Sequence, residues 1–297
     1  MTTLADLAEL VRAPAALSVP GDVVAGAAAA GALGPRTPAL AGASVLLYWA
    51  GMAANDWADR GLDAVERPER PIPSGRVTPA AAVGLAAGLT VAGVGLAAAV
   101  GGRRAAALAV PLAASIWGYD LLAKNTAAGP AVMAVCRGLD VLLGASGGRV
   151  TRALPAAVTV AAHTWTVTAL SRREVSGADA ALPMRTLAGT ALVAASAAIP
   201  HARPADQTGV RNGSARVAAA LPAVLAGWYA ARYGAAQAEV VRDPSAGRVR
   251  AAVGAGITGL PALQGALTAR GGAGLLGLAV AAAAPLGRRL ARKVSPT

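Results

Sequence analysis

The sequence has little charge, few aromatic residues and almost no cysteine. Of its 297 residues, 14% are Asp, Glu, Lys or Arg, 3% are aromatic, and Phe is absent. The single cysteine, Cys136, excludes an intramolecular disulfide and a zinc site built from several cysteines. In contrast, 55% of the residues are hydrophobic and the mean hydropathy is +0.52. Such a composition indicates a membrane protein.

The charged residues are spaced so that long segments contain none. Residues 37–55, 77–102, 153–171, 251–269 and 271–287 hold no Asp, Glu, Lys or Arg. A helix of about 20 residues crosses a ~30 Å hydrocarbon core, because each residue adds about 1.5 Å. A soluble, alanine-rich helical bundle is the alternative. It would carry a polar stripe along most helices, and these segments lack one.

We therefore predict an all-α fold, a polytopic membrane bundle of nine or ten transmembrane helices that forms a single domain over residues 1–297. Segment 250–268 is the weakest candidate span, so the number of crossings stays open. The predicted spans are 14–33, 38–56, 79–100, 105–123, 127–147, 153–171, 185–202, 215–232, 250–268 and 272–289.

Lys and Arg concentrate in alternate loops of this arrangement, around residues 60–76, 124, 172–185 and 232–250, and in the tail 288–293. The positive-inside rule assigns these loops to the cytoplasmic face of the cell membrane. The net charge of +12 is then explained by arginines that face anionic lipid. Because the positive residues are scattered over short loops, nucleic-acid binding is not expected.

The acidic residues cluster in "NDWADRGLDAVERPERPIPSG", residues 55–75, at the inner end of the second span. Asn55, Asp59 and Asp63 are four apart and share one face of a helix, with Asp56 beside it. Carboxylates in such a row repel one another unless cations neutralise them. Hard oxygen ligands suit Mg²⁺, which takes one or two carboxylates and fills its shell with water and phosphates. The rigid turn after the acids is expected to return Arg70 toward them.

This motif, N-D-x-x-D-x-x-x-D followed by R-P-I-x-S-G, resembles the first aspartate-rich motif of the UbiA superfamily of intramembrane prenyltransferases. The resemblance implies helices around a central cavity and transfer of a prenyl group from a prenyl diphosphate to an unknown acceptor, with Mg²⁺ as the cofactor. It implies catalytic roles for Asp56, Asp59 and Asp63, which with Asn55 would bind the metal. It also implies that Asn55, Arg70, Lys124 and Arg173 contact the diphosphate, while the lipid tail lies between helices.

Two further segments carry charge in unusual places. Lys124 lies in "YDLLAKNTAAGP" at the inner end of the fourth span, where family members commonly carry Tyr and Lys; a Lys that reaches to the membrane interface is the alternative. Arg137 and Asp140 lie in mid-span, either as a structural pair or as part of the site. His163 on the sixth span is interpreted as a hydrogen-bonded structural residue.

The second acidic motif departs from the family pattern. At its expected place the chain has "TALSRREVSGAD", residues 168–179, with only Glu174 and Asp179 as metal ligands and two arginines before them. Either one metal is lost or an arginine takes over part of the charge. The patterns C-R-G-L-x-V-L-L-G and S-R-x-E-V-x-G are similar to divergent UbiA-like proteins of bacterial Ebo-type gene clusters. That resemblance questions the usual quinone-type acceptors.

Other classes of protein remain as alternatives. A cation-coupled membrane transporter would use acids or broken helices near the bilayer midplane in repeated positions, where Asp140 is the only comparable acid. An alcohol phosphatidyltransferase would need a D-G-x-x-A-R core, which the sequence does not contain. A non-catalytic UbiA-like protein is the third alternative, because the second motif is weak.

Overall fold

The computed structural model describes residues 2–13, 18–179, 181–199 and 213–283, and within these ranges the chain is helical and contains no strand. The helices are α1 (Leu4–Leu10), α2 (Pro20–Ala30), α3 (Thr37–Glu66), α4 (Pro79–Gly118), α5 (Gly129–Gly144), α6 (Val150–Ser171), α7 (Ala181–Ala198), α8 (Gly213–Tyr229), α9 (Ala235–Arg242) and α10 (Ala246–Arg270). A further apolar helix, Gly274–Ala283, follows α10. Two π-helical turns, η2 (Tyr119–Ala123) and η4 (Ala230–Gly234), extend α4 and α8, and a 3-10 turn, η3 (Ala145–Gly147), follows α5.

Each predicted span overlaps a helix, with 79–100 and 105–123 sharing α4, so the all-α membrane bundle is confirmed. Parts of 14–33, 185–202 and 272–289, and the tail cations at 288–293, lie outside the described residues. In the described ranges four helical segments are long and apolar enough to cross a membrane: α3, α4 with η2, α5 with η3, and α6.

Helix α4 is a hairpin of two helices rather than one long rod. Gly102 has φ 68° and ψ −160°, which breaks the helix. The indole Nε1 of Trp117 donates to Oγ1 of Thr90 at 3.0 Å, although 27 residues separate them. A straight helix would hold the two about 40 Å apart. The predicted separation of 79–100 from 105–123 is therefore confirmed, with the turn at Gly102.

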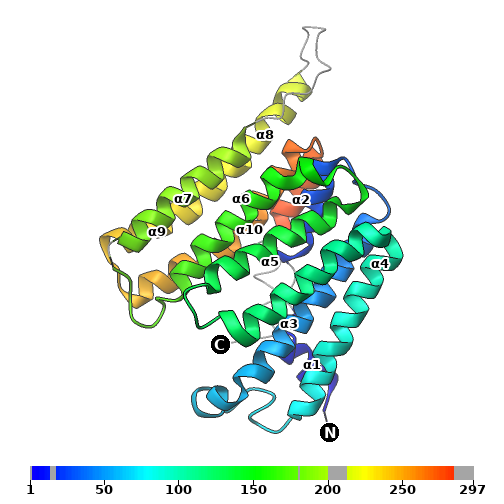
Figure 1. The fold of residues 1–297 in the computed structure, drawn as a ribbon. Coiled ribbons are helices and arrows are strands. Elements are labelled where there is room, and N and C mark those ends of the chain that lie inside the picture. Colours follow the sequence, from blue (N-terminus) through cyan, green and yellow to red (C-terminus); the bar gives the residue numbers. More distant parts are fainter. Residues whose placement is uncertain (1, 14–17, 180, 200–212, 284–297) are drawn as a thin grey trace.

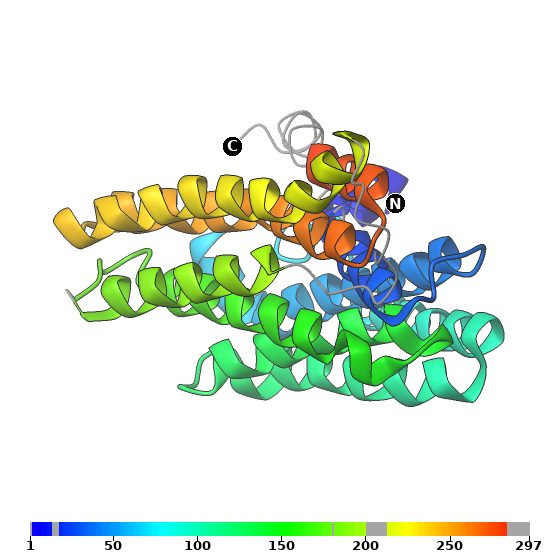
Figure 2. The ribbon, with the colours of Figure 1, turned by 90° about the horizontal axis from the view of Figure 1, so that it is seen from above.

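The second half of helix α10 is enclosed by neighbouring helices, although its segment 250–268 is the weakest predicted span. Every residue from Gly259 to Ala269 is buried, and α10 packs against α2, α6 and α8. Figure 2 shows α8 and α10 along one edge of the view and α4 along the opposite edge. A helix enclosed by protein needs no apolar face toward lipid, which explains its weak hydropathy. In contrast, only 17% of the most apolar 18-residue stretch of α4 and η2 is buried, as expected for a helix that faces lipid.

Small residues allow the closest helix contacts. A Cβ added to Gly26 of α2 would lie 1.8 Å from the carbonyl oxygen of Val141 in α5. A Cβ added to Gly144 of α5 would lie 2.0 Å from the carbonyl oxygen of Val23 in α2. Glycine at both positions lets the two backbones approach directly, as is common between membrane helices.

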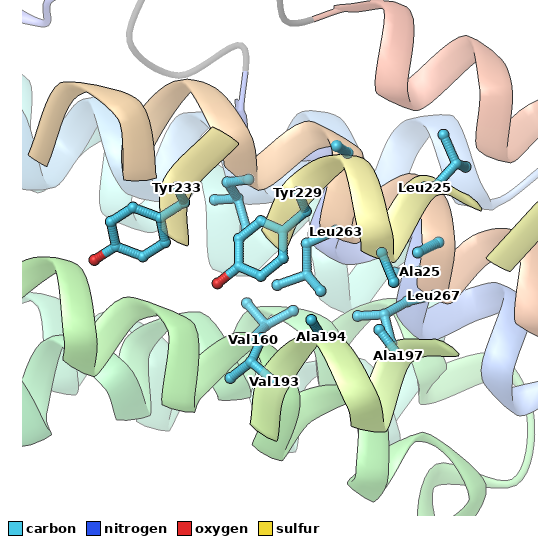
Figure 3. Close-up of a cluster of buried hydrophobic side chains, with 14 of the residues drawn as sticks. Ala25, Val160, Val193, Ala194, Ala197, Leu225, Tyr229, Tyr233, Leu263 and Leu267 are labelled. Atoms are coloured by element: carbon cyan, nitrogen blue, oxygen red, sulfur yellow. The ribbon is translucent and has the colours of Figure 1, made fainter. Parts of the chain in front are cut away.

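The largest core cluster joins α6, α7, α8 with η4, and α10 (Figure 3). Tyr229 and Tyr233 are fully buried in it, beside Leu263 and Val160. The Nδ1 atom of His163 lies 2.8 Å from the Tyr229 hydroxyl. This hydrogen bond agrees with the structural role expected for His163.

Of the two alternatives for the mid-span residues Arg137 and Asp140, the structure does not show a direct ion pair between them. Nε of Arg137 lies 2.7 Å from Oδ2 of Asp22 in α2, and Ser44 donates to Oδ1 of Asp140 at 2.5 Å. Nε2 of Gln264 in α10 donates to Asp22 at 2.6 Å. The Arg137 ion pair therefore joins α2 to α5, and the suggested pair with Asp140 is replaced by a contact with α2.

Candidate active site

The connections that follow α3, η2 and α6 lie at the same end of the bundle (Figure 1). Two contacts tie them together: Nζ of Lys124 lies 2.6 Å from Oδ1 of Asp59 in α3, and the Arg172 guanidinium after α6 donates to the Thr126 carbonyl. The two loops that sequence analysis assigned to one face are thus adjacent to the acidic end of α3.

The local sequence explains why the acids sit on a helix end followed by a turn. Helix α3 continues about three turns beyond the predicted span and ends at Glu66, because Pro68 disfavours the helical conformation for the residue before it. Ser74 N and Oγ both bond the carbonyl of Arg70, and Gly75 adopts φ 73°. This turn brings Arg70 back to the helix, as predicted.

Asp56 and Asp63 form one half of the acidic cluster. Both are buried, with 4% and 2% exposure. Nη1 of Arg70 lies 2.6 Å from Oδ2 of Asp63 and 3.4 Å from Oδ1 of Asp56, and Arg67 lies 3.9 Å from Asp63. Residues seven apart are nearly aligned after two turns, so one arginine reaches both carboxylates.

Asn55 and Asp59 form the other half, and they face η2 instead. Nδ2 of Asn55 donates to Oδ1 of Asp120 at 3.1 Å, while Asp59 pairs with Lys124. The predicted single row of Asn55, Asp59 and Asp63 is therefore divided, since Asp63 aligns with Asp56. The Asp59 side chain is 25% exposed and is the most accessible of the three aspartates.

Asp120 is a site residue that sequence reasoning missed. It lies in the π-helical turn, is 6% exposed, and points one carboxylate oxygen toward Gly51 of α3. In this turn the Lys124 N–H bonds the Tyr119 carbonyl, five residues back. Such turns are frequent at functional sites. The available signal was the spacing of Asp120 and Lys124 within "YDLLAK".

Arg12 is the second missed residue. Its Nη2 lies 2.6 Å from Oδ1 of Asp56, so the segment after α1 reaches into the acidic end of α3. The separation of 44 residues gives no local pattern that would reveal this contact.

The second motif supplies fewer converging groups. Oδ1 of Asp179 accepts from the backbone N–H groups of Ala181 and Leu182 at 3.0 and 2.8 Å, so this carboxylate caps α7. Burial raises the pKa of the half-buried Glu174, opposed by the charge of Arg250, which also donates to the Glu174 carbonyl at 2.8 Å. Arg173 is exposed, and its side chain has no bond to the described part of the chain.

In the described ranges no three Asp, Glu, His or Cys side chains converge as a metal-binding group. The acids of α3 are instead neutralised by Arg12, Arg70 and Lys124. A Mg²⁺ ion that enters with a diphosphate needs only one or two carboxylates from the protein. The partly exposed carboxylate of Asp59, with the amide oxygen of Asn55 as a neutral ligand, fits that requirement better than the enclosed Asp63.

Comparison with known proteins identifies the family of the chain. The model of the UbiA prenyltransferase family matches residues 18–236. The digeranylgeranylglyceryl phosphate synthase of Methanothrix thermoacetophila is 51% identical over 59 residues, which cover 20% of this chain and 22% of that protein. The Halobacterium salinarum protein of the same name is 34% identical over 155 residues, 49% of this chain and 54% of that protein. The chain thus spans about half, or less, of the curated relatives it matches.

Two solved structures share the fold. One comes from work on digeranylgeranylglyceryl phosphate synthase in membranes, with a TM-score of 0.66, 15% identity, and coverage of 90% of this chain and 97% of that chain. The other is the apo structure of a UbiA homologue from Aeropyrum pernix K1, with a TM-score of 0.60, 19% identity, and coverage of 88% and 96%. Since the family model matches most of the chain, this multi-pass membrane protein belongs to the UbiA prenyltransferase family.

Proposed function

We propose that the chain transfers a prenyl group from a prenyl diphosphate to a lipid-type acceptor within the membrane. The observation that carries the proposal is the convergence of Arg12, Arg70 and Lys124 on the carboxylates at one end of an apolar bundle. Mixed positive and acidic groups suit a metal-bound diphosphate, and the bundle suits its hydrocarbon chain. A transporter would need acids in repeated midplane positions, and a non-catalytic protein would not need this arrangement.

The reaction breaks the bond between C1 of the prenyl group and the diphosphate oxygen, and the bonding electrons leave with the diphosphate. An acceptor oxygen forms the new bond to C1, and its proton passes to the released diphosphate. Arg70 and Lys124 donate charge-assisted hydrogen bonds to the leaving oxygens, where negative charge grows most in the transition state. Asp63 holds Arg70, and Asp59 holds Lys124, before the substrate arrives.

The proposed cofactor is Mg²⁺, which when bound neutralises charge on the diphosphate oxygens. Asp59 and Asn55 are its principal protein ligands in this proposal, and Asp56 is the third. Asp63 serves mainly to position Arg70. Glu174 contributes from the second motif, whereas Asp179 is engaged in capping α7.

The acceptor class follows from the relatives. Their name describes a glyceryl phosphate that carries two geranylgeranyl groups, so we propose a hydroxyl of an isoprenoid glycerol lipid as the acceptor. The resemblance to the Ebo-type subgroup remains a prediction, and it concerns mainly the weak second motif. We further propose that residues 1–297 act as one domain in the cell membrane, with this end toward the cytoplasm, since its loops hold many arginines.

The test uses the full-length protein in liposomes that contain a lipid acceptor mixture, with prenyl diphosphates of several lengths and Mg²⁺. Mass spectrometry should detect an acceptor whose mass has increased by one prenyl group, together with an equal amount of released pyrophosphate. Absence of both products with every donor tested, in protein that is folded and inserted, would refute the proposed function.

A further inference from the structure

The N-terminal segment reaches the acidic end of α3 through a strained residue. Arg12 follows α1 and adopts φ 46°; in the described ranges it is the one residue other than glycine with positive φ. This left-handed region is unfavourable for a residue with a side chain, because its Cβ comes close to the following carbonyl oxygen. Strained residues persist only where surrounding contacts hold them, and they cluster at ligand sites. Contacts around Arg12 must therefore hold its backbone in this conformation.

Helix α1 is fixed to the turn after α3 by several contacts. Arg76 pairs with Asp6 at 2.9 Å and with Glu9 at 2.6 Å. Hydrogen bonds from Thr3 and Arg76 lower the pKa of Asp6 to about 2, so this carboxylate stays ionised at neutral pH. Leu10 is fully buried against the same turn, in one cluster with Ile72. These contacts hold Arg12 over the site.

The described residues satisfy the Arg12 guanidinium only in part. Nη2 bonds Oδ1 of Asp56 at 2.6 Å, whereas Nη1 faces the sulfur of Met52 at 3.8 Å. A thioether is a weak acceptor, while guanidinium has five N–H donors. The side chain is 39% exposed, so its outer edge is accessible to a ligand.

A second arginine converges on the same carboxylate oxygen. Arg70 lies 3.4 Å from Oδ1 of Asp56, the oxygen that Arg12 also binds. Two guanidinium groups on one oxygen repel each other, and a further anion with several oxygens would satisfy both. A diphosphate has this property, because planar guanidinium groups bind phosphate oxygens in pairs.

We propose that Arg12 is a substrate-binding residue which α1 delivers to the acidic end of α3, where it binds the diphosphate of the prenyl donor together with Arg70. The inference rests on the proposed function for the identity of the donor. It adds a binding residue outside both acidic motifs. On this account the first helix forms part of the substrate site, and the strained backbone of Arg12 is the cost of placing a guanidinium there.

The experiment measures binding of inorganic pyrophosphate with Mg²⁺ to the full-length protein by calorimetry, without acceptor. Arg12→Ala should weaken binding about tenfold or more, since a hydrogen bond to a charged group is lost. Arg12→Gly removes the guanidinium but relieves the positive φ, so it guards against loss through misfolding and should weaken binding equally. Arg12→Lys should recover part of the affinity.

Arg60→Ala is the matched control. Arg60 also lies near the site end of α3, but it stacks on Trp57 and bonds the Trp57 carbonyl rather than an acid. It should bind pyrophosphate like the original protein. If folded Arg12→Ala and Arg12→Gly proteins also bind normally, the proposed role of Arg12 is wrong.

Kinetics separate the two proposals. Where the unsubstituted protein transfers prenyl groups, Arg12→Ala should raise KM for the prenyl diphosphate and leave KM for the acceptor unchanged; an unchanged KM for the donor would overturn the role. Where the unsubstituted protein binds pyrophosphate in an Arg12-dependent way but transfers no prenyl group, the proposed function fails and Arg12 remains an anion-binding residue.

Discussion

Nζ of Lys124 lies 2.6 Å from Oδ1 of Asp59, and this ion pair joins the π-helical turn after α4 to the acidic end of α3. Among the described ion pairs of Asp56, Asp59 and Asp63, it is the one in which both side chains are partly accessible, at 14% and 25% exposure. A substrate with its own metal and oxygens can therefore exchange partners with both residues.

Asp59→Asn should abolish turnover while the protein stays folded. The substitution removes an anionic ligand and leaves Lys124 unpaired, so both metal and diphosphate are bound less well. Glu174→Gln should be milder and should raise the Mg²⁺ requirement more than it lowers the maximal rate. Mg²⁺ titrations of initial rate at matched protein amounts test the comparison. An active Asp59→Asn with an inactive Glu174→Gln would place the principal metal site on the second motif.

Removal of divalent metal should stop the reaction. With EDTA present, neither prenyl transfer nor pyrophosphate release is expected, and added Mg²⁺ or Mn²⁺ should restore both. The physical reason is that Arg12, Arg70 and Lys124 already neutralise the aspartates of α3. A substrate diphosphate therefore needs further positive charge from a metal ion. Full activity in chelator would contradict a metal role for Asn55 and Asp59.

Asp120→Ala should lower kcat/KM about tenfold, because the Asn55 amide loses its hydrogen-bond acceptor and its orientation. Asp120→Asn retains an acceptor oxygen and should keep most of the activity. Steady-state kinetics of the two variants, with thermal unfolding as the folding control, give the comparison. Equal rates for Asp120→Ala and the unsubstituted protein would exclude a positioning role.

Gly144→Ala should destabilise the bundle by about 1–3 kcal/mol, because the new methyl group would overlap the Val23 carbonyl. Gly88→Ala in α4 is the control, since a Cβ there meets nothing within 4 Å. It should be neutral or stabilising by up to about 1 kcal/mol, given the low helix propensity of glycine. Thermal unfolding in detergent measures both. Similar unfolding temperatures would mean that α2 and α5 can separate slightly without loss.

Cysteines introduced at Ser74 and Ser176 should react with an impermeant reagent from the same side of the membrane, the cytoplasmic one. Both serines are exposed at the site end, and the native Cys136 is buried, so background labelling should be low. Labelling from opposite sides would separate the two acidic motifs, and labelling of both from outside would reverse the proposed orientation.

The sequence predicts the helices well because their ends coincide with charges, prolines and glycines. It separates the two halves of α4 by the arginines beside Gly102, and it predicts the return of Arg70 from the turn residues. The arrangement within the site is harder to predict. Because Asp59 and Asp63 are four residues apart, the sequence pattern predicts that they lie together. In the structure Asp63 lies instead beside Asp56, two helical turns earlier, and Arg70 binds both.

Two contacts depend on more than local pattern, although the spacing in "YDLLAK" draws attention to Asp120. Asp120 faces Asn55 through a π-helical turn, whose extra residue changes which side chains point to α3. Arg12 meets Asp56 across 44 residues and against a backbone preference. Both depend on tertiary contacts that override local propensity.

The long-range contacts of α1 also set an order of events during synthesis. Arg12 leaves the ribosome before Asp56, and Asp6 and Glu9 leave it before Arg76, so α1 has no binding partner until α3 and the following turn have been made. Helix α1 can therefore dock only after the second predicted span and the turn that follows it have been made. A bulky fusion partner placed before α1 would interfere at this late docking step, and a cleavable one would be the safer choice for preparing active protein.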